Sequence, residues 1–94
     1  MKAFKTSKQI ERHVKGIANH RRIDILFLVA AHDGITLEAI AEHLGGNLKT
    51  IGEHTRRLTQ AGLIDKKYRG RNVGHSLSPY GKVFRTFLTT FSHS

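Results

Sequence analysis

The segment ITLEAIAEHLGGNLKTIGEHTRRLTQAGLIDKKYRGRNVGHSL, from Ile35 to Leu77, decides the fold. It predicts a helix, a tight turn, a second helix and a basic two-stranded ribbon, in that order. Thr36 is a good cap for the first helix. The apolar residues of that helix recur at the spacing of one buried face: Leu37, Ile40, Ala41 and Leu44. Gly45 and Gly46 then provide the permissive backbone that a sharp turn needs.

The second helix separates into an apolar and a polar surface. Asn47 can cap its start, and Gly62 favours its end near Ala61. The apolar surface carries Leu48, Ile51, Thr55 and Leu58. The polar surface carries Lys49, Thr50, Glu53, Arg56, Arg57 and Gln60. Taken alone, a basic face is more often a solvated helix surface, but these side chains have the chemistry that reads base edges in DNA.

A basic ribbon follows, with strands expected over Leu63 to Tyr68 and Val73 to Ser78. Its turn lies around Arg69 and Gly70. Four cations occupy its arms and tip, opposed only by Asp65: Lys66, Lys67, Arg69 and Arg71. Such a charged ribbon suits contacts with phosphates beside a groove, which carry little information about sequence.

These segments together resemble a winged helix-turn-helix transcriptional regulator, most closely the arsenical-resistance-repressor (ArsR) family. The resemblance covers most of the chain in colinear order. It rests on GIANHRRIDIL (16–26), LEAIAEHLG (37–45), KTIGEH (49–54), LTQAGLI (58–64) and YRGRNVGHSLS (68–78). The chain departs from the family pattern at four positions. Gly46 stands where the family usually has an apolar plug and Thr55 where it usually has leucine, and Gly74 and His75 stand where the return strand of the wing is usually aromatic.

The resemblance implies a mostly α fold with a small β-hairpin, namely about five helices and a two-stranded wing. It also implies a dimeric repressor whose recognition helix, Asn47 to Ala61, enters the major groove. From side-chain chemistry we expect four residues to read base edges: Lys49, Thr50, Glu53 and Arg57. We expect seven to contact phosphates: Asn47, Arg56, Gln60, Lys66, Lys67, Arg69 and Arg71.

Two helices are expected before this segment. The first begins near Ser7, and the second runs from Arg21 to about His32 with Asn19 as its cap. The second is apolar almost all the way round, which is typical of a helix buried on most sides. We expect its central core contacts to be Ile23, Leu26, Phe27 and Ala30. Arg22 could reach a phosphate or pair with an acid inside the domain, and we expect the pairing.

The last helix should begin at Ser78 and Pro79, a strong start signal. Its apolar stripe either packs on the domain's own core or pairs with the first helix across a two-fold axis. We expect the dimer. Its interface would comprise Ile10, Val14, Ile17, Tyr80, Val83, Phe84, Phe87, Leu88 and Phe91. Dimerisation would place two recognition helices about 34 Å apart, the spacing of successive major grooves.

Length and charge fit this interpretation. With 94 residues the chain should form one domain, residues 1–94, with terminal helices in 1–18 and 79–94. Sixteen Lys and Arg against seven Asp and Glu give a net charge of +9, which favours an anionic partner. Residues 23–47 carry four acids and no Lys or Arg, whereas residues 48–75 carry seven cations and two acids. The positive charge therefore collects on the second helix and the ribbon.

Other classes of function lack support. There is no cysteine, and the seven histidines include no pair at i, i+4 spacing. We therefore expect no metal site within one chain, while a site assembled between subunits stays open. We also expect no cofactor and no evident small-molecule effector. The longest apolar run, Ile25 to Ala31, is too short to span a bilayer, and nothing resembles a signal peptide. A cytoplasmic, nucleoid-associated location follows. No nucleophile elbow, phosphate-binding glycine loop or paired carboxylates indicate an enzyme.

Two alternatives remain to a dimeric regulator of double-stranded DNA. A non-specific architectural protein would use the same basic surface without base readout. A winged-helix domain used for protein association would bind no DNA, and the charge on the reading elements makes it the weakest of the three.

Overall fold

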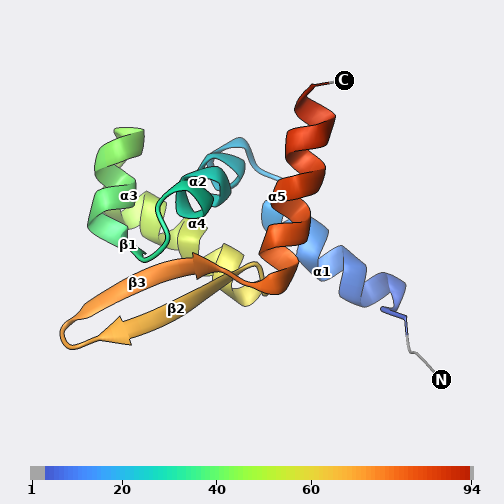
Figure 1. Cartoon of the computed structure of the whole chain (residues 1–94), viewed down its shortest axis with the longest axis horizontal. Helices are drawn as coiled ribbons and strands as arrows, with labels where there is room; N and C mark the ends of the chain where they lie inside the picture. Colours follow the sequence, from blue (N-terminus) through green and yellow to red (C-terminus); the bar gives the residue numbers. More distant parts are fainter. Residues whose placement is uncertain (1–3, 94) are drawn as a thin grey trace.

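A computed structural model describes residues 4–93 of the chain. Residues 1–3 and 94, which belong to the expected terminal segments, lie outside the described residues. Within the described range, five helices and three strands follow one another (Figure 1). They are α1 (Ser7–Ile17), α2 (His20–Ala31), β1 (Ile35–Thr36), α3 (Leu37–Leu44), α4 (Leu48–Gln60), β2 (Ile64–Arg69), β3 (Asn72–Leu77) and α5 (Pro79–Ser92). The predicted fold class is confirmed.

Four helix caps are those that the sequence predicts, and the fifth, Thr6 at the start of α1, was not predicted. The Thr36 side chain accepts a hydrogen bond from the backbone N–H of Ala39. Asn19, Asn47 and Ser78 likewise accept N–H groups in the first turns of α2, α4 and α5. Because these oxygens satisfy donors that have no partner inside the helix, each cap fixes where its helix starts.

The wing belongs to a three-stranded sheet, one strand more than predicted. Strands β2 and β3 form the expected antiparallel hairpin, and β1 pairs with the other edge of β3. A side chain on Gly74 would come within 2.8 Å of the carbonyl oxygen of Gly34. The buried imidazole of His75 contacts the carbonyl oxygen of Ile35 through Nδ1 at 2.9 Å. These two departures from the family pattern therefore allow β1 to lie close against β3.

The core lies between α2, α3, α4 and the base of the sheet. Helix α2 turns a different face inward from the one predicted. Ile25, Leu26 and Val29 are fully buried, whereas Ile23, Phe27 and Ala30, which we expected beside Leu26, are only partly buried. A helix that is apolar almost all round has no polar face to indicate its orientation, so the neighbouring elements decide it.

Two further departures from the family pattern are explained by packing around α4. A side chain on Gly46 would lie 2.7 Å from Ile51 Cγ1, so Ile51 fills the space that an apolar plug would take. Thr55 is buried, and its hydroxyl donates to the carbonyl oxygen of Ile51 at 2.8 Å. The hydroxyl is therefore satisfied inside the helix's own turn.

Arginine side chains bind the carbonyl groups at the ends of three helices. Arg12 donates two hydrogen bonds to the carbonyl oxygen of Gln60 at the end of α4, at 3.1 and 2.9 Å. Arg21 donates to Leu44 at the end of α3. Arg22 donates to the carbonyl oxygens of residues 15 and 16 at the end of α1. Cations at helix C-termini are favourable because the helix dipole is negative there.

Helix α1 holds the end of α4 at a very short separation. His13 is buried, and its Nδ1 lies 2.6 Å from the carbonyl oxygen of Ala61. Because a carbonyl only accepts, Nδ1 carries the proton. Gly16 faces Ala61 so closely that a Cβ on it would overlap the Ala61 methyl group. Gly16 therefore permits a helix contact that any other residue would prevent.

We expect Gly16→Ala to lower the free energy of unfolding by about 1–3 kcal/mol, because it overpacks the contact between α1 and α4. Gly52→Ala is the matched control, since Gly52 is also helical and a Cβ there would meet only the flexible end of Leu37 at 3.3 Å. It should be neutral or stabilise by up to about 1 kcal/mol. Urea denaturation measures both, and equal effects would show that the contact is loose.

Candidate nucleic-acid interface

Helix α4 presents its polar surface to solvent. Six residues of this surface are exposed, as predicted: Lys49, Thr50, Glu53, Arg56, Arg57 and Gln60. On the opposite surface Ile51, Thr55 and Leu58 are buried, but Leu48 is 48% exposed. The prediction that Leu48 lies on the buried side of the helix is wrong: it is the first residue of α4, and its side chain is half exposed. We call the six exposed residues the polar face of α4.

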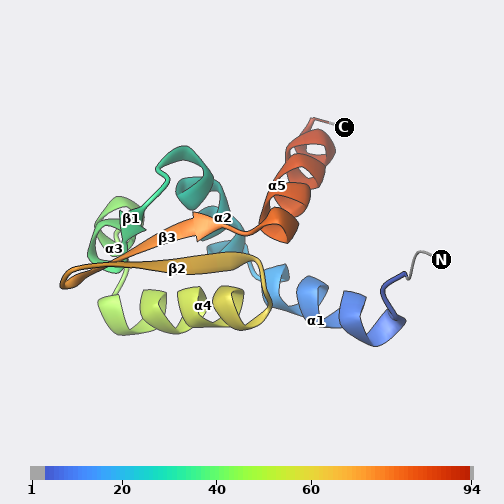
Figure 2. The ribbon, with the colours of Figure 1, turned by 60° about the horizontal axis from the view of Figure 1, so that its bottom comes forward.

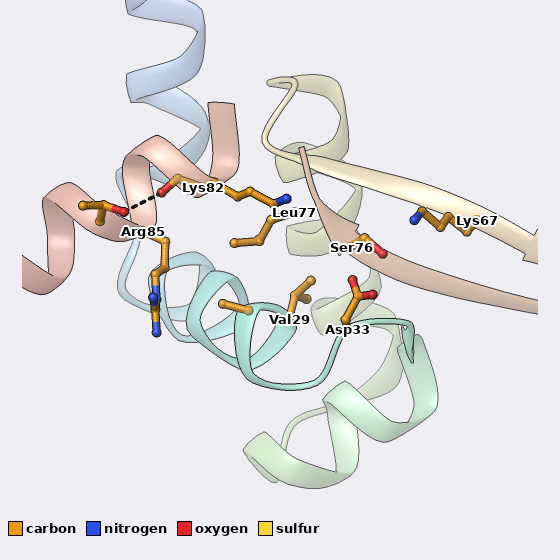
Figure 3. Close-up of a pocket in the computed structure, with 9 residues that line it drawn as sticks. Val29, Asp33, Lys67, Ser76, Leu77, Lys82 and Arg85 are labelled. Carbon is orange, nitrogen blue, oxygen red and sulfur yellow. Dashed lines mark hydrogen bonds between the residues drawn. The ribbon is translucent and has the colours of Figure 1, made fainter. Parts of the chain in front are cut away.

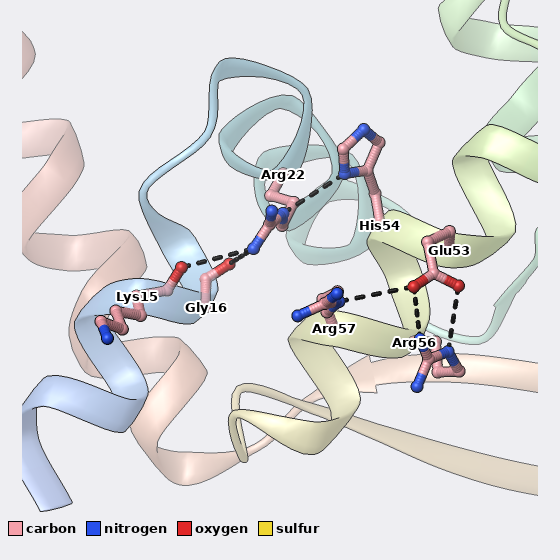
Figure 4. Close-up of polar contacts among 7 residues, drawn as sticks. All are labelled: Lys15, Gly16, Arg22, Glu53, His54, Arg56 and Arg57. Atoms are coloured by element: carbon pink, nitrogen blue, oxygen red, sulfur yellow. Dashed lines mark hydrogen bonds and ion pairs between the residues drawn. The ribbon is translucent and has the colours of Figure 1, made fainter.

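A carboxylate shared by two arginines lies in the middle of the polar face (Figure 4). Glu53 accepts from Arg56 Nε at 3.1 Å and also binds the Arg56 Nη2 group, and it lies 3.4 Å from Arg57 Nε. The Arg56 hydrogen bond is the main cause that lowers the Glu53 pKa, so the carboxylate is charged. Exposed ion pairs are weak, so a DNA phosphate can compete for either guanidinium.

The start of α4 is polar as well, but part of it is already used. The Asn47 side-chain oxygen accepts the backbone N–H groups of Lys49 and Thr50 at 2.8 and 3.3 Å. Only the Asn47 amide nitrogen is therefore left for a phosphate. The ammonium group of Lys49 and the hydroxyl of Thr50 form none of the side-chain hydrogen bonds found within residues 4–93.

The wing lies alongside α4, so both elements reach the same side of the molecule. Figures 1 and 2 show the hairpin and α4 extending together toward one end, with α1 and α5 at the other. Helix α4 also packs directly on β2. A groove-binding helix and a ribbon that follows the adjacent backbone need this arrangement.

The four wing cations do not face one way. Side chains alternate along a strand, so Lys66 and Tyr68 share a face with Ile64, whose side chain is buried in the core. Lys67 and Arg69 lie on the opposite face. Arg69 precedes the hairpin turn, whereas Lys67 lies farther from the tip, so the phosphate contact predicted for Lys67 is the one that the geometry supports least.

Arg22 and His54 link α2 to the flank of α4. Arg22 Nε donates to His54 Nδ1 at 3.3 Å (Figure 4). The expected partner of Arg22 was an acid, and that prediction is wrong, because its guanidinium binds carbonyl groups and an imidazole. Burial, with the Arg22 charge second, lowers the pKa of His54. His54 is therefore a neutral acceptor, and Arg22 belongs to the scaffold.

An exposed apolar strip covers the outer sides of α1 and α5. Its members, six of the nine expected interface residues, are Ile10, Val14, Tyr80, Val83, Phe87 and Phe91. Phe84 and Leu88 are partly buried against the core. Ile17 is 6% exposed and belongs to the core, so its predicted interface role is wrong. It lies at the end of α1, where the helix meets α2 and α4. We call the six exposed residues the apolar strip.

Two residues on these surfaces were missed by sequence reasoning. Tyr68 is 74% exposed on the wing, and Leu48 is exposed at the start of α4. Tyr68 lies on the same face of β2 as the buried Ile64, so the period-2 pattern of the strand alone would have placed it inward. Nothing in the helical pattern distinguishes Leu48 from a core residue.

Within residues 4–93, no group of three or more His, Cys, Asp or Glu side chains is placed to bind a metal ion. The closest histidine rings, His32 and His43, have centroids 5.2 Å apart. In the same part of the chain, no helix has the length and apolar character to cross a membrane.

Comparison with known proteins identifies the family. A family model described as winged helix-turn-helix DNA-binding matches residues 19–65, half of the chain. This chain belongs to that family. The matched region runs from the cap of α2 to the first residues of the wing, so it contains the whole helix-turn-helix unit. A search of curated proteins gives no match.

Several solved structures have the same fold as this chain. The homodimeric winged helix-turn-helix domain of Mb0332 from Mycobacterium bovis, a possible ArsR-family regulator, is 24% identical with a TM-score of 0.83, covering 98% of this chain and 91% of that one. HlyU from Vibrio cholerae is 20% identical with a TM-score of 0.84, covering 98% and 100%. FabT from Streptococcus pneumoniae, solved with DNA, is 14% identical with a TM-score of 0.73, covering 92% and 66%.

His54 should titrate below its ordinary pKa of 6.5. The native pKa of His54 is lower than its pKa in the unfolded chain, so protonation of the imidazole destabilises the fold. The stability that the neutral imidazole contributes is complete above about pH 6.5 and is lost as the pH falls through the native pKa. NMR titration of the imidazole measures the midpoint. Arg22→Gln should raise the midpoint by removing a neighbouring charge, and a wild-type midpoint at or above 6.5 would contradict the burial of His54 against Arg22.

Proposed function

We propose that this winged helix-turn-helix protein is a sequence-specific, homodimeric repressor of transcription that binds double-stranded DNA. DNA binding follows from the family, and its solved neighbours are transcriptional regulators of the ArsR and HlyU type. Because its target is chromosomal DNA, we place it at the nucleoid in the cytoplasm. All residues from 1 to 94 would act as one DNA-binding domain.

The observation that carries the proposal is the exposure of the polar face of α4 beside the wing. Lys49 and Thr50 at its start have free donor groups, and Arg57 presents a guanidinium that suits guanine. Glu53 would accept from cytosine once Arg56 turns to a phosphate. This division assigns base reading to Lys49, Thr50, Glu53 and Arg57.

Phosphate contacts would come from both sides of the polar face. Gln60 and Arg56 lie on α4, and the Asn47 amide nitrogen points out at its start. Lys66 and Arg71 line one hollow between the wing and the beginning of α3. Contacts of this kind fix the register of the protein on the duplex and are insensitive to sequence. Arg69, next to the hairpin turn, would contact a phosphate from the opposite face of the wing.

The dimer is supported by the apolar strip. Six large apolar side chains, each at least 44% exposed, lie on two adjacent helices of a 94-residue chain. A patch of that kind is typical of a protein interface. Mb0332 is homodimeric, and a two-fold pairing through α1 and α5 would leave both wings pointing outward.

We expect Arg71→Ala and Glu53→Ala to affect DNA binding differently. Arg71→Ala removes a phosphate contact, so it should weaken binding to every duplex alike and reduce the slope of log affinity against log salt by about one unit. Glu53→Ala should change which bases are tolerated. Fluorescence anisotropy with a selected site and a random duplex measures both.

The same titration separates the alternatives. A specific regulator should keep its site against an excess of random DNA with a preference on the order of 10³ or more, whereas an architectural protein would show none. Equal losses on both duplexes for Arg71→Ala and Glu53→Ala would contradict base readout by Glu53. An absence of salt-dependent binding would favour a role in protein association.

A further inference from the structure

A second cationic site lies away from the polar face of α4. A cavity of about 500 Å³ opens between the end of α2, the base of the wing and α5 (Figure 3). Its volume falls within the range of small-molecule sites. Val29 and Leu77 form apolar lining, and Lys67 reaches it from the face of β2 that turns away from the core. Lys67 is also the wing cation whose predicted contact with a DNA phosphate the structure supports least.

The cavity carries excess positive charge. Lys67, Lys82 and Arg85 line it together with one acid, Asp33. No acidic residue occurs in the sequence after Asp65. Among residues 4–93 the ion pairs involve only Glu11 and Glu53 as acids, so none of these three cations is neutralised. The local charge favours an anion.

A buried hydroxyl in the lining lacks a partner. Ser76 is 4% exposed, and its Oγ has no hydrogen-bond partner within the described residues. Buried polar groups are nearly always paired, because desolvation without a hydrogen bond is costly. Figure 3 shows Ser76 and the ends of Lys67, Lys82 and Asp33 around the same space. Ser76 can donate to an oxygen atom placed there.

We propose that this cavity binds a small organic anion, a carboxylate or phosphate group on a compact apolar body. Lys67 and Lys82 hold the charged group, and Ser76 donates to one of its oxygens. Val29 and Leu77 contact the apolar part, and Arg85, whose guanidinium lies at the far side of the cavity, adds to the positive charge there. The proposal is independent of DNA recognition. A ligand in this position touches the wing, the end of α2 and the dimerisation helix α5 at once, although the sequence shows no effector motif.

Calorimetric titration of the whole chain tests the site. The probes are benzoate and phenyl phosphate, which distinguish the two headgroups, with benzyl alcohol as the uncharged control. We expect at least one anion to bind and benzyl alcohol not to bind. Lys82→Gln should weaken binding of that anion about tenfold, because it removes one charge contact with the ligand. Asp33→Asn should tighten it, because a repelling carboxylate is removed.

The matched control is Lys8→Gln, which removes the same charge from the exposed surface of α1 and should leave the affinity unchanged. Lys8 and Lys82 are both exposed, so both variants should keep the wild-type circular dichroism and melting temperature. The proposal is overturned if neither anion binds, if Lys82→Gln binds as tightly as Lys8→Gln, or if Asp33→Asn weakens binding.

Discussion

The contact between α1 and the C-terminal end of α4 sets the geometry on which the other features depend. Gly16 lets the two backbones approach at Ala61, and Arg12 and His13 bind the last carbonyl groups of α4. This contact joins the two functional surfaces, because α1 carries part of the apolar strip while α4 carries the polar face. In the proposed dimer, a few short contacts would therefore fix the angle between the partner subunit and the DNA groove.

Much of the fold can be predicted from local signals. Thr36, Asn47 and Ser78 mark helix starts through their side-chain oxygens, and these signals need no tertiary information. The inward face of α2 could not be predicted, since its apolar residues surround the helix. Strand β1 has only two residues, and it depends on the long-range fit of Gly74 and His75 against residues 34 and 35.

In the candidate site, the exposed residues can be predicted from the sequence, but their partners cannot. Helical periodicity correctly separates the polar face of α4 from its buried side, apart from Leu48. It cannot assign partners, so it misses the sharing of Glu53 by two arginines. The roles of Arg12, Arg21 and Arg22 at helix ends arise between residues far apart in sequence. Because these three arginines bind backbone carbonyl groups, the net charge of the chain overstates the number of cations that are available to DNA.

In the proposed dimer, the arrangement of α4 beside the wing is repeated about a two-fold axis, so the DNA site should have the same symmetry. Selection of bound sites from a random duplex pool tests it most directly. Two symmetric copies should enrich an inverted repeat whose half-site centres lie about 10 base pairs, or 34 Å, apart, or a multiple of that distance. Enrichment of no consensus, or of one without two-fold symmetry, would contradict a dimer that reads base edges with paired α4 helices.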